Sequence, residues 1–345
     1  MKKGISMTIS FCSPVYNVKD YLKPCIESIY AQKITDFEII CIDDCSTDGS
    51  YELLLNLSDI YSELVVKKNK TNMGISCSRN LALKMSRGKY VWFVDADDML
   101  VPDTAGLYLS IAEKESANAV LGSFTSFNDG SLPEYKNGTD AYHRVSFSDM
   151  DDFYPKRSTG YPCFGVWLGI FNRSFLLTNN IRFRENLSVY EDYTFYFEFG
   201  MASKRVIRVD HYGYYYRIRE NSASHMDRNK LMKRGFECSK QVLAIYEDYR
   251  DRCTPELQET YDLHVFIMKR LSIRCLSRID DNNFVKEGLQ YLKKEGIYPF
   301  KYDDRADFSE KLNWKVKMFR KMLTKEQSFR IARAINLIRF RRSEK

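Results

Sequence analysis

The stretch Tyr90-Val91-Trp92-Phe93-Val94 is an apolar run of β-branched and aromatic residues, and it is followed directly by Asp95-Ala96-Asp97-Asp98. Such a run predicts a buried strand. Carboxylates gathered at the end of a buried strand repel one another and resist desolvation, so they need a compensating positive charge. A hard divalent cation that also binds substrate phosphates is a natural candidate. The alternative is a solvated acidic turn in which Asp98 or Asp103 caps the next helix.

Strands and helices alternate on both sides of this stretch. Strands are expected over 8–12, 37–42, 64–66, 90–94 and 119–121, and helices over 20–32, 48–57, 74–85 and from 103. Strands separated by helices of this length predict an α/β fold, with a mostly parallel sheet flanked by helices and joined by right-handed crossovers.

The pattern changes after residue 125. Residues 126–160 are rich in Asn, Asp, Gly, Ser and Pro and lack periodicity, so we expect a long surface excursion there. Regular structure resumes over 164–171, and is followed by a helix over 191–202 and by two strands over 205–209 and 212–217. From residue 229 onward the pattern is helical. We therefore expect an α/β domain over 1–225 and a helical region over 226–345.

The composition is that of a globular protein. The chain has 345 residues, 44% of them hydrophobic, and no stretch approaches the ~20 apolar residues of a membrane span. The basic N-terminus precedes an apolar run that breaks at Ser13-Pro14, which does not match a signal peptide. The nine Cys show no paired metal-type spacing, so we expect reduced thiols and a cytoplasmic location.

The positive charge of the chain is concentrated in its tail. Residues 309–345 carry a net charge of +9, whereas the whole chain carries +7, so residues 1–308 sum to −2. This distribution argues against a core that binds nucleic acid. In the tail, apolar residues are interleaved with Lys and Arg. This pattern predicts helices that lie on an anionic membrane surface, at the inner face of the cell membrane, or that pack on the core or form a dimer contact.

Polar residues follow two further strands, and ligands of open α/β sheets bind at such strand ends. After the first strand, Pro14, Tyr16 and Asn17 offer a rigid turn, an aromatic face and an amide, which suit stacking and hydrogen bonding to a base. After the second strand, Asp43 or Asp44 can accept hydrogen bonds from the imide or ribose of a nucleoside. For Asp48, in the same loop, we favour a helix N-cap.

The segment from Asn72 to Asn80 lies between the second and third polar strand ends. Gly74 permits close approach, and a helix N-terminus follows it. Arg79 and Asn80 lie one to two turns into that helix, where they face the pocket, form a helix-surface pair or make a structural hydrogen bond to the neighbouring loop.

Six motifs in the same order make the sequence resemble a family 2 glycosyltransferase with the Rossmann-like GT-A fold. They are Ser13-Pro-Val-Tyr-Asn, Ile42-Asp-Asp-Cys-Ser-Thr-Asp-Gly-Ser50, Asn72-x-Gly-x-Ser-x-Ser-Arg-Asn80, Gly88-Lys-Tyr-Val-Trp-Phe-Val-Asp-Ala-Asp-Asp98, Glu191-Asp192 and Tyr215-Tyr-Arg-x-Arg-x-Asn-Ser-x-Ser224. The resemblance covers about residues 5–225.

The resemblance implies a nucleotide-sugar donor, UDP by family frequency, and a glycan or lipid-linked acceptor. Asp95 and Asp97 would form the D-x-D pair, with Asp97 as the more direct ligand of Mg²⁺ or Mn²⁺. Asp192 would be the catalytic base of an inverting transfer. The donor-binding set that it implies is Pro14, Tyr16, Asn17, Asp43, Asp44, Asn72, Gly74, Arg79, Asp95, Ala96, Glu191, Arg217, Arg219, Ser222 and Ser224.

Other interpretations stay open for parts of this set. Glu191 and Asp192 would also suit the first turn of a helix by complementing its dipole. The segment with Arg217 and Arg219 resembles the family's closure over the diphosphate, but it could equally be a basic strand-to-loop face. His225 could add a metal ligand, although a structural role is the more ordinary one.

Two other classes of protein fit the sequence less well. A nucleotidyltransferase has a similar fold but would carry a Gly-rich, Lys-containing loop where this chain has Pro14-Val-Tyr-Asn17. A nucleotide-sugar-binding relative without transferase activity would lack the catalytic base. The presence of Asp95, Asp97 and Asp192 argues against that alternative.

Overall fold

The computed structural model describes residues 7–136, 138–146, 164–219 and 227–299, together with Phe329 and Arg333. The chain divides into two compact units, Met1–Glu220 and Asn221–Lys345. The sequence places this boundary between residues 225 and 226.

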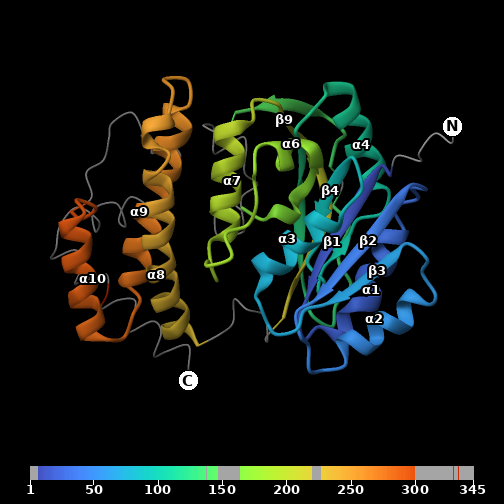
Figure 1. Cartoon of the computed structure of the whole chain (residues 1–345), viewed down its shortest axis with the longest axis horizontal. Coiled ribbons are helices and arrows are strands. Elements are labelled where there is room, and N and C mark those ends of the chain that lie inside the picture. The colour runs from blue at the N-terminus through green and yellow to red at the C-terminus, as the bar shows by residue number, and fades with distance from the viewer. Residues whose placement is uncertain are drawn as a thin grey trace. The chain divides into compact units, whose positions relative to one another are not determined.

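A nine-stranded sheet forms the centre of the first unit, counted over the described residues (Figure 1). Eight strands follow the order β3-β2-β1-β4-β8-β6-β9-β5, and β7 pairs with β9. Their bounds are β1 Ile9–Val15, β2 Phe37–Asp43, β3 Leu64–Lys68, β4 Tyr90–Phe93, β5 Met99–Leu100, β6 Ala119–Asn128, β7 Tyr142–Val145, β8 Gly169–Asn172 and β9 Val206–Ile218. The predicted α/β class is confirmed.

The four strands β3, β2, β1 and β4 run parallel to one another. All seven residues of β2 are buried, as expected of a parallel strand covered on both faces. Trp92 of β4 lies between Phe11 and Tyr108, at ring-centroid distances of 6.0 and 5.3 Å. Because these strands are parallel, β1, β2 and β4 end at one side of the sheet, which we call the carboxyl edge.

The other half of the sheet departs from the parallel pattern. β8 runs antiparallel to β4 and β6, and β9 runs antiparallel to β5 and β7 but parallel to β6. The sheet is therefore parallel over its first four strands and mixed over the rest.

Two boundaries differ from the sequence prediction here. β9 is one continuous strand where two were expected, because Asp210 is exposed and His211 is buried, as strand alternation allows. The His211 Nε2 atom lies 3.1 Å from the Thr104 hydroxyl. In addition, β6 extends to Asn128 and β7 lies within the predicted excursion, of which residues 137 and 147–160 fall outside the described part of the chain.

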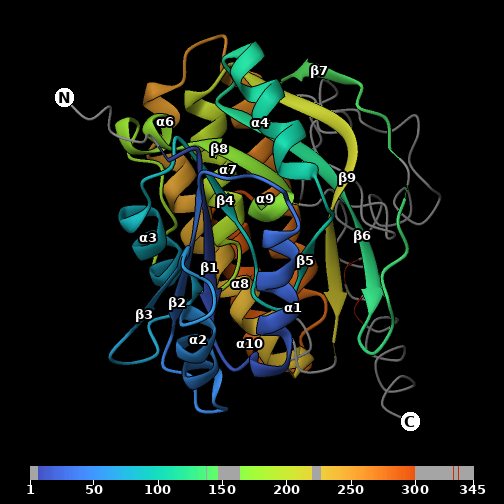
Figure 2. The same cartoon turned by 90° about the vertical axis from the view of Figure 1, so that its right-hand side faces the viewer.

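Helices connect these strands near their predicted positions. They are α1 Lys19–Tyr30, α2 Ser50–Ser58, α3 Ile75–Met85, α4 Thr104–Glu115, the 3₁₀ turn Val166–Leu168, α6 Arg173–Thr178 and α7 Glu191–Ala202. Figure 2 shows α1 and α3 on opposite sides of β1.

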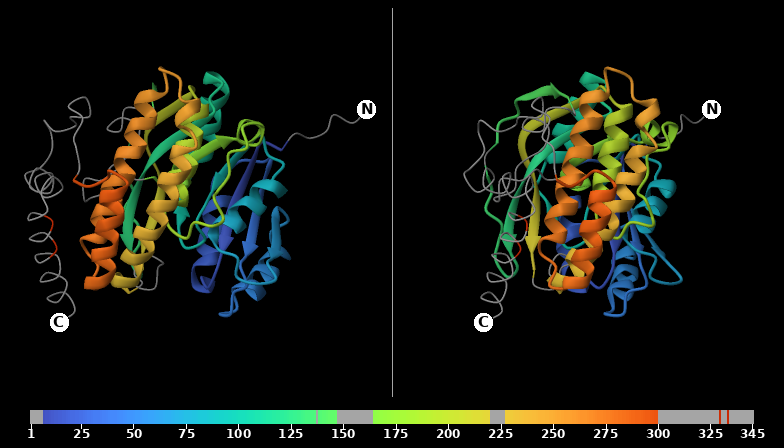
Figure 3. Two further views of the ribbon diagram at one scale, coloured as in Figure 1. Left: turned by 60° about the vertical axis from the view of Figure 1, so that its left-hand side comes forward. Right: turned by 90° about the vertical axis from the view of Figure 1, so that its left-hand side faces the viewer.

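The described part of the second unit is helical, as predicted. It comprises α8 Arg228–Glu247, the 3₁₀ turn Arg250–Arg252, α9 Gln258–Leu276 and α10 Asn282–Lys294. α8 and α9 lie side by side (Figure 3), and the Ser272 hydroxyl donates to Ser239 Oγ at 2.7 Å between them. Among the described residues, every helix is too short or too polar to cross a membrane. The predicted amphipathic tail lies outside the described residues, apart from Phe329 and Arg333.

Candidate functional site

The three polar strand ends meet at the carboxyl edge, as the sequence predicts. The loops that follow β1 and β2 are tied together by hydrogen bonds. Asn17 Oδ1 accepts from the Thr47 amide at 2.8 Å, and the Asn17 amide donates to Ser46 Oγ at 3.1 Å. Asn17 thus shapes the turn that follows β1.

The prediction that Asp48 is the helix N-cap is wrong, because Gly49 occupies that position; Asp48 lies one residue before it and ties the start of α2 to the start of α1. Its two carboxylate oxygens accept from the backbone amides of Ser50 and Lys19, at 2.9 and 3.0 Å. Burial would raise the pKa of Asp48, but the hydrogen bonds from Ser50 and from the Lys19 amide outweigh burial and lower it.

Asp43 is the better placed of the two acids proposed for the nucleoside. It is fully buried, and its Oδ1 atom accepts from the Ser46 amide at 3.1 Å. Its Oδ2 atom has no hydrogen-bond partner among the described residues. A buried acceptor without a partner is costly unless a ligand supplies the donor. Nearby, Tyr16 presents an aromatic side chain that is 48% exposed.

Asp44 instead anchors the loop that precedes α3. Its Oδ1 atom accepts from Asn69 Nδ2 and from the Met73 amide, each at 2.8 Å, and its Oδ2 atom accepts from the Gly74 amide at 2.7 Å. Gly74 has a φ of 89°, a region that favours glycine. With both oxygens occupied, Asp44 holds the loop, and Asn72 is exposed in that loop.

The guanidinium of Arg79 lies at the centre of three carboxylates. Its Nη2 atom is 2.8 Å from Asp95 Oδ1, and its Nη1 atom is 2.9 Å from Asp192 Oδ1 and 3.2 Å from Glu191 Oε1. The Arg79 side chain is only 2% exposed. It is therefore not a surface group. It supplies part of the positive charge that the carboxylates of Asp95–Asp98, which we call the acidic cluster, require.

A second arginine compensates the next carboxylate of the cluster. Arg219 Nε lies 2.6 Å from Asp97 Oδ2. Arg217 donates from its amide to Asp98 Oδ1 at 2.7 Å and from its Nε atom to the Asp97 carbonyl at 2.8 Å. Hydrogen bonds thus join the end of β9 to the acidic cluster, although the bonded residues are 119 to 122 positions apart in the sequence.

The residues of the acidic cluster differ in exposure. The Asp95 and Asp97 side chains are 23% and 20% exposed, whereas Asp98 is 1% exposed and Ala96 is 3% exposed. Burial, with Asp97 and Asp95 nearby, raises the pKa of Asp98 well above its usual range. Asp98 is thus a structural acceptor for the Arg217 amide, while Asp95 and Asp97 face the open side.

The side chains of this site can supply only part of the coordination of a metal ion. Among the described residues, no group of three acidic, His or Cys side chains is arranged to hold a metal by itself. Mg²⁺ is commonly held by one or two carboxylates together with substrate phosphates and water. Burial and the neighbouring Asp95 raise the pKa of Asp97, which a bound cation would oppose. Asp97 and Asp95 therefore fit a cation that is shared with a diphosphate.

Asp192 lies in the first turn of α7, next to the residue that starts this helix. Burial raises the pKa of Asp192, Arg79 opposes the rise, and Glu191 and Asp95 add to it. A carboxylate whose pKa lies nearer neutrality is a better match for a general base than an ordinary aspartate. Asp192 therefore lies at a helix N-terminus, where an acid complements the helix dipole, and it also forms an ion pair with Arg79.

Several site residues carried no sequence signal. Tyr21 of α1 donates its hydroxyl to Asp129 Oδ2 at 2.7 Å, and its ring lies 5.0 Å from the Arg217 guanidinium. The Phe127 ring lies 4.6 Å from the same guanidinium. The predicted Ser222, Ser224 and His225 lie outside the described residues.

Comparison with known proteins defines the class of this site. The family model for Glycosyl transferase family 2 matches residues 10–175. The poly(ribitol-phosphate) beta-N-acetylglucosaminyltransferase TarP of Staphylococcus aureus is 30% identical over 83% of this chain and 84% of TarP. The chain therefore belongs to glycosyltransferase family 2.

Other relatives match over a smaller share of their length. A poly(ribitol-phosphate) beta-glucosyltransferase of Bacillus spizizenii is 28% identical over 64% of this chain, which is 33% of that protein. The glycosyltransferase GlyA of Streptococcus pneumoniae is 30% identical over 65% of this chain and 32% of its own length. The chain spans about a third of the length of these two relatives.

Solved structures share the fold. Residues 1–349 of S. aureus TarS in complex with UDP-GlcNAc align with a TM-score of 0.55 and 19% identity, over 86% of this chain and 94% of that one. The mannosyltransferase PcManGT of Pyrobaculum calidifontis, in complex with GDP-Man and Mn²⁺, aligns with a TM-score of 0.54 and 16% identity, over 95% and 86%. These likenesses confirm the GT-A fold.

Proposed function

We propose that this chain is an inverting, metal-dependent glycosyltransferase that moves a sugar from a UDP-linked donor to a surface-glycan acceptor. The observation that carries the proposal is the shared contact of Arg79 with Asp95 and Asp192. It brings a carboxylate of the D-x-D pair and the candidate base to one guanidinium at the carboxyl edge.

The donor would bind across the three strand ends. Pro14 and Tyr16 would flank the base, and the Asp43 Oδ2 atom would accept a hydrogen bond from the imide. UDP is favoured because the neighbour TarS binds UDP and UDP-GlcNAc. Asp97 and Asp95 would hold Mn²⁺ or Mg²⁺, which supplies charge neutralisation at the diphosphate when bound.

The chemistry would fall to Asp192. Its carboxylate takes the proton from the acceptor hydroxyl while that oxygen attacks the anomeric carbon, from the face opposite the nucleotide. The bond between the anomeric carbon and the diphosphate oxygen breaks, so the configuration inverts. Arg217 and Arg219 would bind the diphosphate through their donor forks.

The acceptor is proposed from the relatives. TarP and the Bacillus spizizenii enzyme are named for poly(ribitol phosphate), so an anionic surface glycan, free or lipid-linked, is the acceptor class that we favour. We also propose that residues 309–345 associate peripherally with the cytoplasmic face of an anionic membrane. A further part of the proposal is that the chain self-associates. Sedimentation with anionic vesicles, with and without the tail, tests the former, and analytical ultracentrifugation tests the latter.

The central test measures transfer and hydrolysis of UDP-sugars with Mn²⁺. Asp97→Ala and Asp192→Asn should each lower kcat by about 100-fold or more, and Asp20→Asn should not, since Asp20 is an exposed acid in the first turn of α1. If both site variants match the wild type, the assigned roles are wrong. Nucleotide binding without turnover would favour the binding-protein alternative, and release of pyrophosphate from a nucleoside triphosphate and a sugar phosphate would favour a nucleotidyltransferase.

A further inference from the structure

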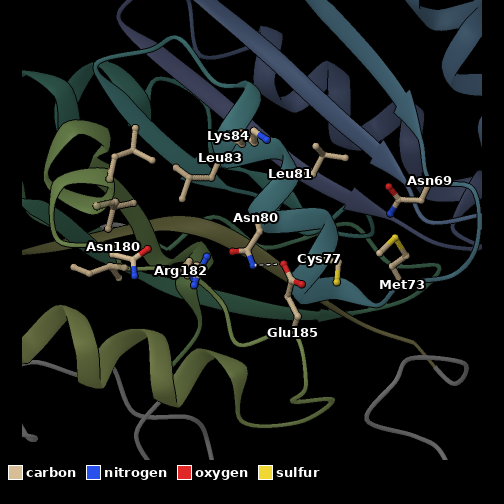
Figure 4. A pocket seen from close by; sticks show the side chains of 13 residues that line it. Asn69, Met73, Cys77, Asn80, Leu81, Leu83, Lys84, Asn180, Arg182 and Glu185 are labelled. Atoms are coloured by element: carbon tan, nitrogen blue, oxygen red, sulfur yellow. Dashed lines mark hydrogen bonds between the residues drawn. The ribbon is translucent and has the colours of Figure 1, made fainter. Parts of the chain in front are cut away.

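A hollow of about 570 Å³ lies beside α3, and it is separate from the site described above. One wall is the outer face of α3 and the other is the segment 176–185, as Figure 4 shows. Its size falls in the range of small-molecule sites. Its lining consists of Asn69, Met73, Cys77, Asn80, Leu81, Leu83, Lys84, Leu176, Leu177, Asn180, Ile181, Arg182 and Glu185.

The apolar part of the lining is aliphatic or sulfur-containing, and it supplies seven of the thirteen lining residues. Leu83, Leu176 and Ile181 are almost fully buried beneath the hollow, whereas Leu177 is 47% exposed and Met73 is 54% exposed at the surface. None of the described lining residues is aromatic, so the hollow offers no platform for stacking a base. A hydrocarbon chain is the ligand that such a surface favours, because its burial removes apolar area from water.

Two cations stand at the rim. Lys84 and Arg182 are both exposed, and within the described ranges neither side chain has an ion pair or a hydrogen bond. The one acidic lining residue, Glu185, is held by Asn80, whose Nδ2 atom donates to Glu185 Oε1 at 3.0 Å. With Glu185 ionised, the lining carries two cations and one carboxylate, a net charge of +1, and a lysine with an arginine suits a phosphate group.

The hollow and the acidic cluster lie on different faces of α3. Arg79 points to Asp95 and Asp192, while the adjacent Asn80 points to the 176–185 segment. Asn80 Nδ2 donates to the Phe183 carbonyl, and Asn80 Oδ1 accepts from the Phe183 amide, each at 2.9 Å. An occupant of the hollow is therefore a second ligand, distinct from the nucleotide-sugar.

We propose that this hollow binds an aliphatic chain that ends in a phosphate, with the chain between α3 and the 176–185 segment and the phosphate at Lys84 and Arg182. The occupant to which we assign it is the lipid end of a lipid-linked acceptor. That assignment rests on the proposed function, whereas the binding itself does not.

The test uses Cys77, a half-buried lining thiol, as a reporter in the full chain. Burial and Glu185 raise the pKa of the Cys77 thiol to about 11, so alkylation is slow and can be followed by mass spectrometry. Cys253 of the second unit is the internal reference. The probes are decyl phosphate below its micelle concentration, decyl glucoside and inorganic phosphate, each compared with buffer alone.

Decyl phosphate should slow the alkylation of Cys77 by at least about fivefold and leave that of Cys253 unchanged. The double variant Lys84→Glu/Arg182→Glu should need about tenfold more probe, whereas Lys67→Glu, which reverses an exposed lysine on β3, should behave as the wild type. Equal protection by decyl glucoside or by inorganic phosphate would overturn the proposal, as would full protection in the double variant. Because no sugar transfer is measured, failure here is distinguishable from failure of the proposed function.

Discussion

Arg79 Nη1 lies 2.9 Å from Asp192 Oδ1, so the candidate base forms an ion pair with a residue from a different motif, 113 positions earlier in the chain. The same guanidinium contacts Asp95 through its other nitrogen. The state of the base and the state of the D-x-D pair are thus linked through one buried side chain, and both should respond to a change at Arg79.

Replacement of Arg79 should affect stability and activity together. Arg79→Met leaves three carboxylates without their common partner, and breaking a buried pair typically costs about 3–5 kcal/mol. We therefore expect a fall in the free energy of unfolding of this order and a loss of transfer of about 100-fold or more. Lys33→Met is the control, since its ion pair with Asp103 is exposed and should contribute less than about 1 kcal/mol. Unchanged stability of Arg79→Met in urea denaturation would contradict the assignment.

The activity should depend on pH through Asp192. Because burial raises the pKa of this carboxyl, the protonated, inactive form persists to higher pH than for an ordinary aspartate. The value of kcat/KM should therefore rise with pH as Asp192 loses its proton, with an apparent pKa well above about 4. Measurement of kcat/KM from about pH 5 to 9 checks this. An acid limb at the ordinary aspartate pKa would exclude Asp192 in its buried setting as the base.

Substitution of the adjacent residues Asp43 and Asp44 should affect different properties: UDP affinity for Asp43 and stability for Asp44. Asp43→Asn changes an acceptor with no partner among the described residues, so UDP affinity should fall about tenfold with little loss of stability. Asp44→Ala removes the acceptor for three donors of the 69–74 loop and should lower stability by about 2–3 kcal/mol. Calorimetric UDP titration and thermal denaturation of both variants separate the roles. Equal effects on binding and stability would show that the two are not divided in this way.

Gly88 should be intolerant of any side chain. A Cβ atom at this position would lie 2.5 Å from the Ser10 amide nitrogen and 2.6 Å from the Ile9 carbonyl carbon, both backbone atoms of β1. Gly88→Ala should therefore destabilise the chain by about 1–3 kcal/mol. Gly106→Ala, within α4, meets nothing within 4 Å and should be neutral or slightly stabilising. A melting temperature unchanged in Gly88→Ala would mean that β1 can shift.

Much of the fold could be predicted because its signals are local. The run over 90–94 and the alternation of helices and strands in the first 125 residues depend on neighbouring residues in sequence. The sequence predicts β6 and β9 less well, because polar residues within these strands, such as Ser123 and Asp210, resemble those of a loop. Their pairing with each other, which keeps them extended, is a property of the folded sheet.

The sequence motifs predict which residues form the candidate site, but they do not predict which of these residues contact one another. The motif predicts that Asp97 binds a metal, but only the position of the end of β9 shows that Arg219 is its partner. The contacts of Tyr21 with Asp129 and Arg217 join a helix to two distant strand ends, and its sequence position gives no hint of them. The sequence groups Asp44 with Asp43 because they are neighbours, but Asp43 is the last residue of β2 and Asp44 lies beyond it, and their carboxylates accept from different loops.

The sharing of one guanidinium by Asp95, Glu191 and Asp192 has a consequence for the order in which ligands arrive. When all three carboxylates are ionised, this group carries a net charge of −2. A bare diphosphate approaching that charge is repelled, while a diphosphate already complexed with a divalent cation is not. The nucleotide should therefore enter as its metal complex, so the initial rate should follow the concentration of that complex rather than the concentration of free nucleotide.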